Sequence, residues 1–218
     1  MARLRTAGPL AAFAVLMMLL GVVSAGVLGY RTGQRAGEAS GLSVSRSASQ
    51  VEGKILAVIV RRNPGATVRE FLRFPNQLMT EADRLDLDFR YVMAVVEKES
   101  EWRPQAVSYA GAIGLMQLTP ETAALVVKKA QIEGYEPPVP NRASPRYSSL
   151  GSLGEPSFNI RIGMQYLRWK IDEMGLGPEH LRAYNRGASK AKVYWPGDAY
   201  AESIALKFVA LALLIRDR

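Results

Sequence analysis

Residues 111–123 read Gly-Ala-Ile-Gly-Leu-Met-Gln-Leu-Thr-Pro-Glu-Thr-Ala, an apolar loop punctuated by glycine that leads into a helix. The two glycines permit a close approach of the backbone to its neighbours. The side chain of Gln117 offers two hydrogen-bond donors and one acceptor. Thr119 suits the N-cap of the following helix, with Pro120 at its first position. This stretch predicts a tightly packed loop beside the start of a helix.

A helix with acidic residues at its end precedes this loop. Residues 89–96 carry an apolar stripe at helical spacing, and Glu97, Glu99 and Glu101 follow it. At 100° per residue, Glu99 is inclined toward the apolar side slightly more than Glu97, and Glu101 turns away. A carboxyl group held against apolar surface has a raised pKa and suits a general acid. The ordinary alternative is a solvated acidic helix end.

The composition removes several classes of chemistry. The chain has 218 residues, no cysteine and one histidine, His180. This excludes a disulfide framework, a thiolate nucleophile, a lipid-modified N-terminal cysteine and metal sites built from several cysteines or histidines. We therefore expect carboxylates to do the acid–base work. The net charge of +8 favours an anionic polymer or membrane surface. It does not favour nucleic acid, because no dense basic stripe with interleaved aromatics is found.

The N-terminal segment predicts export from the cytoplasm. Residues 1–30 hold Arg3 and Arg5 and, after them, no charged side chain. A helix here would cross about 30 Å of hydrocarbon, with its basic leader on the cytoplasmic side. We expect a transmembrane anchor in the inner membrane through residues 8–30. The alternative is a signal peptide cleaved near Ala25. Either interpretation places the rest of the chain outside the cytoplasm.

The remaining chain predicts a linker followed by an all-α domain. Residues 31–65 are expected to be a linker, rich in Gly, Ser, Ala and Arg up to residue 50, with a short helix at 51–61. No alternating strand pattern is seen, and residues 134–157 form a long loop. Asp86 or Asp88 would cap the helix that begins at residue 89. Within the domain at 66–218, the expected helices cover 67–80, 81–85, 89–96, a helix opened by Thr119, and 158–174, 178–185 and 198–215.

Five segments in fixed order carry a resemblance to a known family. They are Glu99-Ser100, Ser108 with residues 111–123, Asn159-Ile160 with Gly163 and Tyr166-Leu167, Ala183-Tyr184-Asn185 with Gly187, and Tyr200. Over roughly residues 80–210 the chain resembles the catalytic domain of soluble lytic transglycosylases, whose fold is similar to goose-type lysozyme. The resemblance implies a lysozyme-like, all-α fold acting on peptidoglycan.

The resemblance also implies roles for individual residues. It makes Glu99, rather than Glu97, the catalytic acid. Arg186 is a departure, because the family usually has Ala there, and its charge would suit peptide carboxylates of a substrate. The implied substrate-binding residues are Ser100, Ser108, Gly114, Leu115, Met116, Gln117, Tyr166, Tyr184, Asn185 and Tyr200, with Ser108 and Met116 near the N-acetyl group.

The reaction implied is cleavage of the β-1,4 bond between N-acetylmuramic acid and N-acetylglucosamine with closure of a 1,6-anhydro ring. Ordinary glycosidases need two carboxylates ~5–9.5 Å apart. No Asp occurs between Asp88 and Asp172, which fits a mechanism with one Glu as acid and then base. The implied route needs no metal and no cofactor. Two alternatives stay open. One is a hydrolytic muramidase of the same fold, and the other is an inactive glycan-binding or scaffold module tethered to the membrane.

Overall fold

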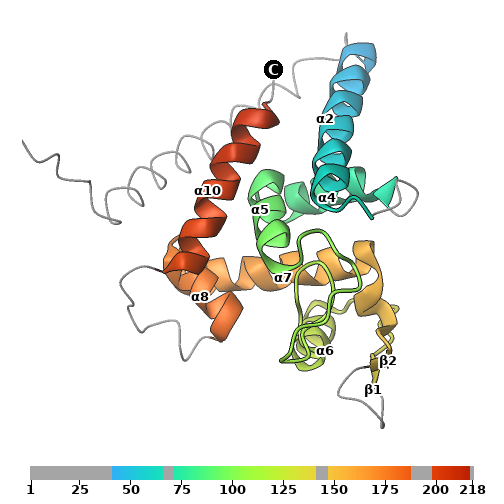
Figure 1. Ribbon diagram of the computed structural model, residues 1–218, viewed down its shortest axis with the longest axis vertical. Helices are drawn as coiled ribbons and strands as arrows, with labels where there is room; N and C mark the ends of the chain where they lie inside the picture. Colours follow the sequence, from blue (N-terminus) through green and yellow to red (C-terminus); the bar gives the residue numbers. More distant parts are fainter. Residues whose placement is uncertain (1–40, 66–70, 141–146, 188–197, 217–218) are drawn as a thin grey trace, which may run out of the picture.

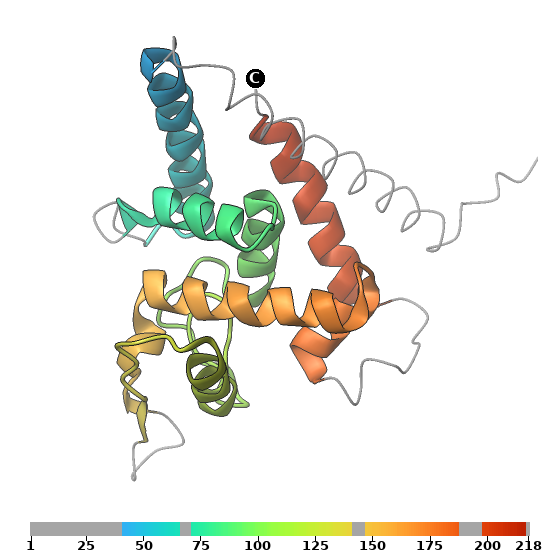
Figure 2. The same cartoon turned by 180° about the vertical axis from the view of Figure 1, so that it is seen from behind.

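The computed structural model describes residues 41–65, 71–140, 147–187 and 198–216. Helices α5 (Phe89–Glu99) and α10 (Ala199–Leu214) pack along each other, and α7 (Pro156–Met174) runs across the view below them (Figures 1 and 2). The other elements are α2 (Gly41–Arg62), α4 (Phe74–Arg84), α6 (Pro120–Ala130), β1 (Val139–Pro140), β2 (Tyr147–Ser149), the 3₁₀ helix η1 (Gly151–Gly154) and α8 (Pro178–Arg186). Helix α7 contacts α4, α6 and α8 and so joins three other helices.

Helix α5 lies at the centre of the main core. Every residue from Arg90 to Glu97 is buried, so the helix is covered on all sides. Tyr91 packs edge-on against Phe208 of α10, with ring centroids 5.9 Å apart. The mostly helical body confirms the all-α expectation in its main features. Because α5 is held so completely, the carboxyl groups at its C-terminal end are fixed relative to α10.

Two predicted helix starts are confirmed. The carboxylate of Asp88 accepts a hydrogen bond from the backbone N–H of Arg90 at 2.8 Å, so Asp88 rather than Asp86 caps α5. Thr119 Oγ1 accepts from the backbone N–H of Thr122 at 3.2 Å, and Pro120 is the first residue of α6. Each cap satisfies a backbone donor that the helix itself leaves free.

Helix α2 is longer than the sequence predicted. It begins at Gly41, so residues 41–50, predicted to be linker, are helical. Its C-terminal half is packed, since Ile55 and Ile59 are fully buried in the main core. Helix growth is cooperative, so a packed segment extends into neighbouring residues of modest propensity. Helix α2 therefore packs as part of the body.

Helix α4 replaces the two short helices predicted at 67–80 and 81–85. It runs without a break through the predicted boundary, from Phe74 to Arg84. Leu78 and Ala82 are four positions apart and both buried, so one helical face continues across that point. Burial of this single face keeps the helix continuous.

The long loop at 134–157 contains structure that the sequence did not predict. Strands β1 and β2 form an antiparallel pair in which Val139 lies opposite Ser149, and η1 follows. Strands of two and three residues are too short to produce a periodic pattern, which explains why none was seen. Leu153 of η1 is fully buried in a second apolar cluster with Ile113 and Ile162, so this loop packs against α7.

The predicted anchor or signal at residues 1–30 lies outside the described residues. Among the residues that the structure does describe, none of the helices is both long and apolar enough to cross a membrane.

Candidate active site

Two neighbouring glutamates at the end of α5 have different surroundings. The carboxylate of Glu97 is 4% exposed and lies 2.7 Å from Lys207 Nζ of α10. It also lies 3.2 Å from Arg62 Nη2, at the end of α2. These ion pairs compensate a buried charge and join three helices. Glu97 therefore has the surroundings of a structural carboxylate.

Glu99 is half-buried, and among the described residues no pair of cations lies against its carboxylate as at Glu97. The hydroxyl of Tyr200, from the first turn of α10, donates a hydrogen bond to its carboxylate. Burial raises the pKa of Glu99, while the Tyr200 hydrogen bond and the charge of Lys98 act in the opposite direction. A carboxyl group with a raised pKa keeps its proton at higher pH, as a general acid requires.

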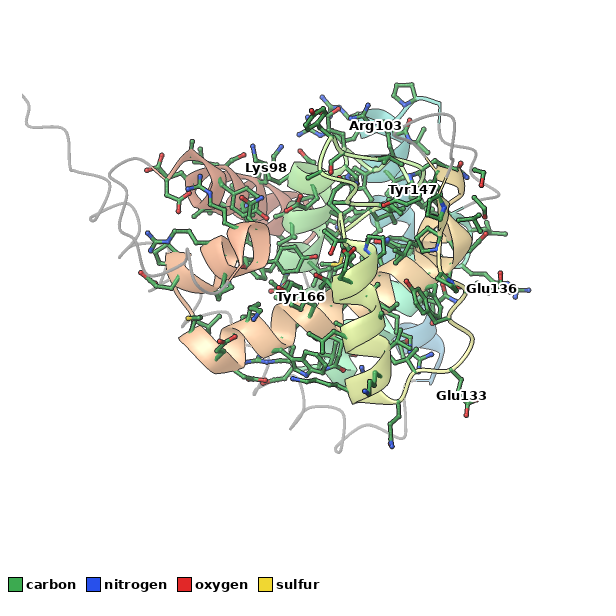
Figure 3. The ribbon with its side chains drawn as sticks, turned by 90° about the horizontal axis from the view of Figure 1, so that it is seen from below. Lys98, Arg103, Glu133, Glu136, Tyr147 and Tyr166 are labelled. Carbon is green, nitrogen blue, oxygen red and sulfur yellow. The ribbon has the colours of Figure 1, made fainter. Side chains whose placement is uncertain are left out.

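A further tyrosine, Tyr184, lies near Glu99, and Tyr166 packs against it. The rings of Tyr166 from α7 and Tyr184 from α8 are in contact, with centroids 5.2 Å apart. Burial, and next the Glu99 carboxylate, raise the pKa of Tyr184 well above its ordinary value. Figure 3 shows Tyr166 near the middle of the molecule seen from below, with Lys98 nearer its edge. Helices α8 and α10 thus bring Tyr184 and Tyr200 toward Glu99 at the end of α5, and α7 adds Tyr166 behind Tyr184.

The glycine loop, residues 108–118, is tightly folded, as predicted. Gly114 has a φ of 83°, and a Cβ there would collide with Asn159 Nδ2 and with the carbonyl oxygen of Leu153. Gln117 has a φ of 47°, and its Nε2 donates to the carbonyl oxygens of Ala106 and Gly114. The amide of Gln117 thus ties the loop to itself.

Ser108 does the same at the other end of this loop. Its Oγ accepts a hydrogen bond from the backbone N–H of Ala112 at 3.0 Å. The side chain is half-buried, so part of it stays open to solvent.

Several of the predicted substrate-binding side chains, that of Tyr184 among them, are buried. Ser100 is buried and its Oγ donates to the carbonyl oxygen of Val96. Leu115 and Met116 are fully buried in the main core. Any part that Leu115 and Met116 have in substrate binding runs through backbone and packing rather than through exposed side chains. Asn185, at the end of α8, is exposed.

The structure gives Tyr200 a more specific position than the sequence did. The sequence grouped Tyr200 with the substrate-binding residues, whereas its hydroxyl contacts Glu99 itself. Asn159 was quoted only as part of a motif, yet it is fully buried and hydrogen-bonded to the glycine loop. The sequence signal that could have identified Asn159 is a polar residue on an otherwise apolar face of α7. Within the described ranges, no group of three or more His, Cys, Asp or Glu side chains is placed to hold a metal ion.

The model of the Transglycosylase SLT domain matches residues 78–205, more than half of the chain, and the chain belongs to this family. The match spans α5, the glycine loop, α7, α8 and the start of α10, so it includes every element that surrounds Glu99.

Particular relatives carry more specific names. The chain is 35% identical over 142 residues to the soluble lytic murein transglycosylase of Salmonella typhimurium, covering 63% of this chain and 20% of that protein. It is 35% identical over 116 residues to the membrane-bound lytic murein transglycosylase C of Haemophilus influenzae, covering 49% of this chain and 29% of that protein. The chain thus spans between a fifth and a third of the length of these relatives.

Two solved structures are also similar. One is an inactive mutant of the lytic transglycosylase Slt from Pseudomonas aeruginosa, with a TM-score of 0.49 and 25% identity over 63% of this chain and 24% of that one. The other is the 70 kDa soluble lytic transglycosylase of Escherichia coli, with a TM-score of 0.49 and 23% identity over 74% of this chain and 24% of that one.

Proposed function

We propose that this chain is a peptidoglycan lytic transglycosylase. It cleaves the β-1,4 bond between N-acetylmuramic acid and N-acetylglucosamine and leaves a 1,6-anhydromuramoyl end. The observation that carries the proposal is the half-buried Glu99, with its raised pKa and its hydrogen bond from Tyr200. Membership of the Transglycosylase SLT domain family and the names of the murein transglycosylase relatives support it.

The chemistry needs one carboxyl group that acts twice. Protonated Glu99 gives its proton to the glycosidic oxygen as the bond to the muramoyl C1 breaks. The 2-acetamido oxygen of the substrate stabilises the cationic sugar, as in substrate-assisted glycosidases. The Glu99 carboxylate then removes the proton from the muramoyl C6 hydroxyl, whose oxygen bonds to C1. The proton returns to Glu99, and no water is consumed.

The other acidic groups at the end of α5 are poor candidates for a second catalytic carboxylate. Glu97 is engaged by Lys207 and Arg62. Glu101 is exposed, and its carboxylate lies 3.6 Å from Arg103. A mechanism in which the substrate supplies its own acetamido group and hydroxyl is consistent with this arrangement.

Mass spectrometry of products tests the proposal. The full-length protein, in detergent, is incubated with purified sacculi, and the released muropeptides are weighed. An anhydro product is lighter by one water than the product of a hydrolytic muramidase. Release of anhydro products by the wild type and not by a Glu99→Gln variant is the expected result. Hydrated ends would make the chain a muramidase, and binding without release would make it a glycan-binding module.

We also propose that the enzyme acts in the cell envelope, held at the inner membrane through residues 8–30. The uncharged stretch after Arg3 and Arg5 supports this location. Fractionation of cells that express the full chain, followed by N-terminal sequencing, is the test. A membrane-bound protein with an intact N-terminus is expected. A soluble periplasmic protein that starts at Gly26 would replace the anchor with a cleaved signal.

A further inference from the structure

The backbone of Met116 is held from two sides by side chains of different helices. Its N–H donates to Asn159 Oδ1 of α7 at 2.8 Å. Its carbonyl oxygen accepts from the hydroxyl of Tyr184, on α8, at 2.8 Å. The glycine loop is thereby fastened between two helices that are distant in sequence.

Asn159 uses its whole side-chain amide for this purpose. It is 0% exposed, and its Nδ2 donates to the carbonyl oxygens of Ile113 at 3.0 Å and Leu153 at 2.9 Å. Two carbonyl acceptors and one N–H donor surround the amide, which fixes its orientation. Loss of this residue would remove a hydrogen bond from each of three backbone groups, which is costly in the interior. Of these, the Ile113 carbonyl oxygen would keep its hydrogen bond from the Leu118 N–H at 3.1 Å.

The contact on the far side of Met116 leads to the catalytic centre. Tyr184 lies close enough to the Glu99 carboxylate for that charge to raise the pKa of its phenol, after the larger effect of burial. Its ring packs on Tyr166. The position of the Tyr184 ring therefore depends on where the Met116 carbonyl lies, and that depends on Asn159.

We propose that Asn159 is a positioning residue, which acts through the backbone of Met116 to hold the Tyr184 ring beside Glu99. In this position the ring keeps water from one side of the Glu99 carboxyl group. The proposal rests on the proposed function, in which Glu99 is the reacting acid. The hydrogen bonds of Asn159 go to the backbone of Met116, Ile113 and Leu153 and not to Glu99, so Asn159 acts through other residues.

Two variants disturb the backbone of Met116 in different ways. Asn159→Ser introduces a side chain that is too short to make all three hydrogen bonds of the Asn159 amide. Gly163→Ala leaves Asn159 intact but places a Cβ 2.6 Å from Met116 Cβ, so Met116 must shift. Alanine suits the interior of α7 better than glycine does, so this variant has no helix-propensity cost. Ile55→Ala, in the core contact of α2, is the matched control for lost stability alone.

Three measurements on the full chain separate a positioning role from a structural one. Hydrogen exchange of residues 113–117 is expected to quicken in Asn159→Ser and Gly163→Ala but not in Ile55→Ala. Turnover per folded molecule is expected to fall roughly 10²-fold in both, as for a misplaced catalytic group, with a much smaller change in KM. The high-pH limb of kcat is expected to move to lower pH, because water that reaches Glu99 relieves the burial that raises its pKa.

The possible results are distinct. Faster exchange with unchanged turnover and pH limb in Gly163→Ala would overturn the positioning role, as would Ile55→Ala effects equal to those of the two variants. If Asn159→Ser does not fold, Gly163→Ala and its control decide. Failure of the wild type to release anhydro products would reject the proposed function instead, and the exchange data would still report whether Asn159 holds the loop.

Discussion

The hydroxyl of Tyr200 donates a hydrogen bond to the carboxylate of Glu99 across 101 positions of sequence. Lys207, two turns further along α10, pairs instead with Glu97. One helix thus gives two nearby glutamates of α5 different partners, a cation for Glu97 and a neutral hydroxyl for Glu99. A cation stabilises a permanent carboxylate, whereas a neutral donor in a half-buried site leaves the carboxyl group able to take up and release a proton.

Glu99→Gln is expected to abolish lysis of sacculi without loss of the fold. The substitution removes the titratable proton at nearly constant volume, and loss of a general acid costs about 10²–10⁴ in rate. Turbidity of a sacculus suspension measures the activity, and circular dichroism measures the folded fraction.

Glu97→Gln is the matched variant, two positions earlier on the same helix. It is expected to keep its activity per folded molecule and to lose about 1–3 kcal/mol of stability, because Lys207 and Arg62 lose a charged partner. An inactive but stable Glu97→Gln, beside an active Glu99→Gln, would exchange the two roles.

Tyr200→Phe is expected to move the high-pH limb of kcat to higher pH. The Tyr200 hydrogen bond stabilises the ionised form of Glu99 and so lowers its pKa, against the larger effect of burial. Without the hydroxyl, the pKa of Glu99 rises further, and the carboxyl group keeps its proton to higher pH. The pH dependence of initial rates is the measurement. A limb that moves to lower pH would show that Tyr200 excludes water more than it stabilises the charge.

The sequence predicted those parts of the structure that depend on neighbouring residues. The caps at Asp88 and Thr119 and the ends of α7, α8 and α10, each within two residues, follow from local signals. The length of α2 depends on the burial of Ile55 and Ile59 by distant helices, which no local pattern encodes. The partners of the two glutamates are also non-local, so helical geometry alone left Glu97 and Glu99 nearly equivalent.

Acid should destabilise the folded protein through its single histidine. Burial, with a smaller contribution from the charge of Arg168, lowers the pKa of His180 from 6.5 to about 4. Between pH 6.5 and about 4 the unfolded chain takes up a proton that the folded chain does not. Stability is therefore lost as the pH falls through this range, by about 3 kcal/mol in total from this residue. Above pH 6.5 the residue contributes no pH dependence.

Urea denaturation at several pH values tests this effect, with His180→Gln as the comparison. The ring nitrogens of His180 contact the Tyr91 hydroxyl at 2.6 Å and the Gly177 N–H at 3.1 Å, so the variant is expected to be less stable at pH 7. Its stability should nevertheless fall less steeply between pH 6.5 and 4.5. Equal slopes for the two proteins would remove His180 as the cause.

Asn185→Ala is expected to reduce activity and leave stability almost unchanged. An asparagine at this place often serves only to close a helix, but here Gly187, with a φ of 85°, donates its N–H to the carbonyl oxygen of Ala183 and ends α8. The side chain of Asn185 is exposed at the C-terminal end of α8, directly after Tyr184. It is thus available to orient a sugar, and loss of such a transition-state hydrogen bond costs on the order of 10²–10³ in rate.

Melting temperature and initial lysis rate are measured on the same samples, with the exposed Glu133→Ala as control. A change within about 0.5 kcal/mol in stability is expected for both variants. Lysis by Asn185→Ala at the rate of Glu133→Ala would remove Asn185 from the site, and Tyr184 would then be the contribution of α8 to it.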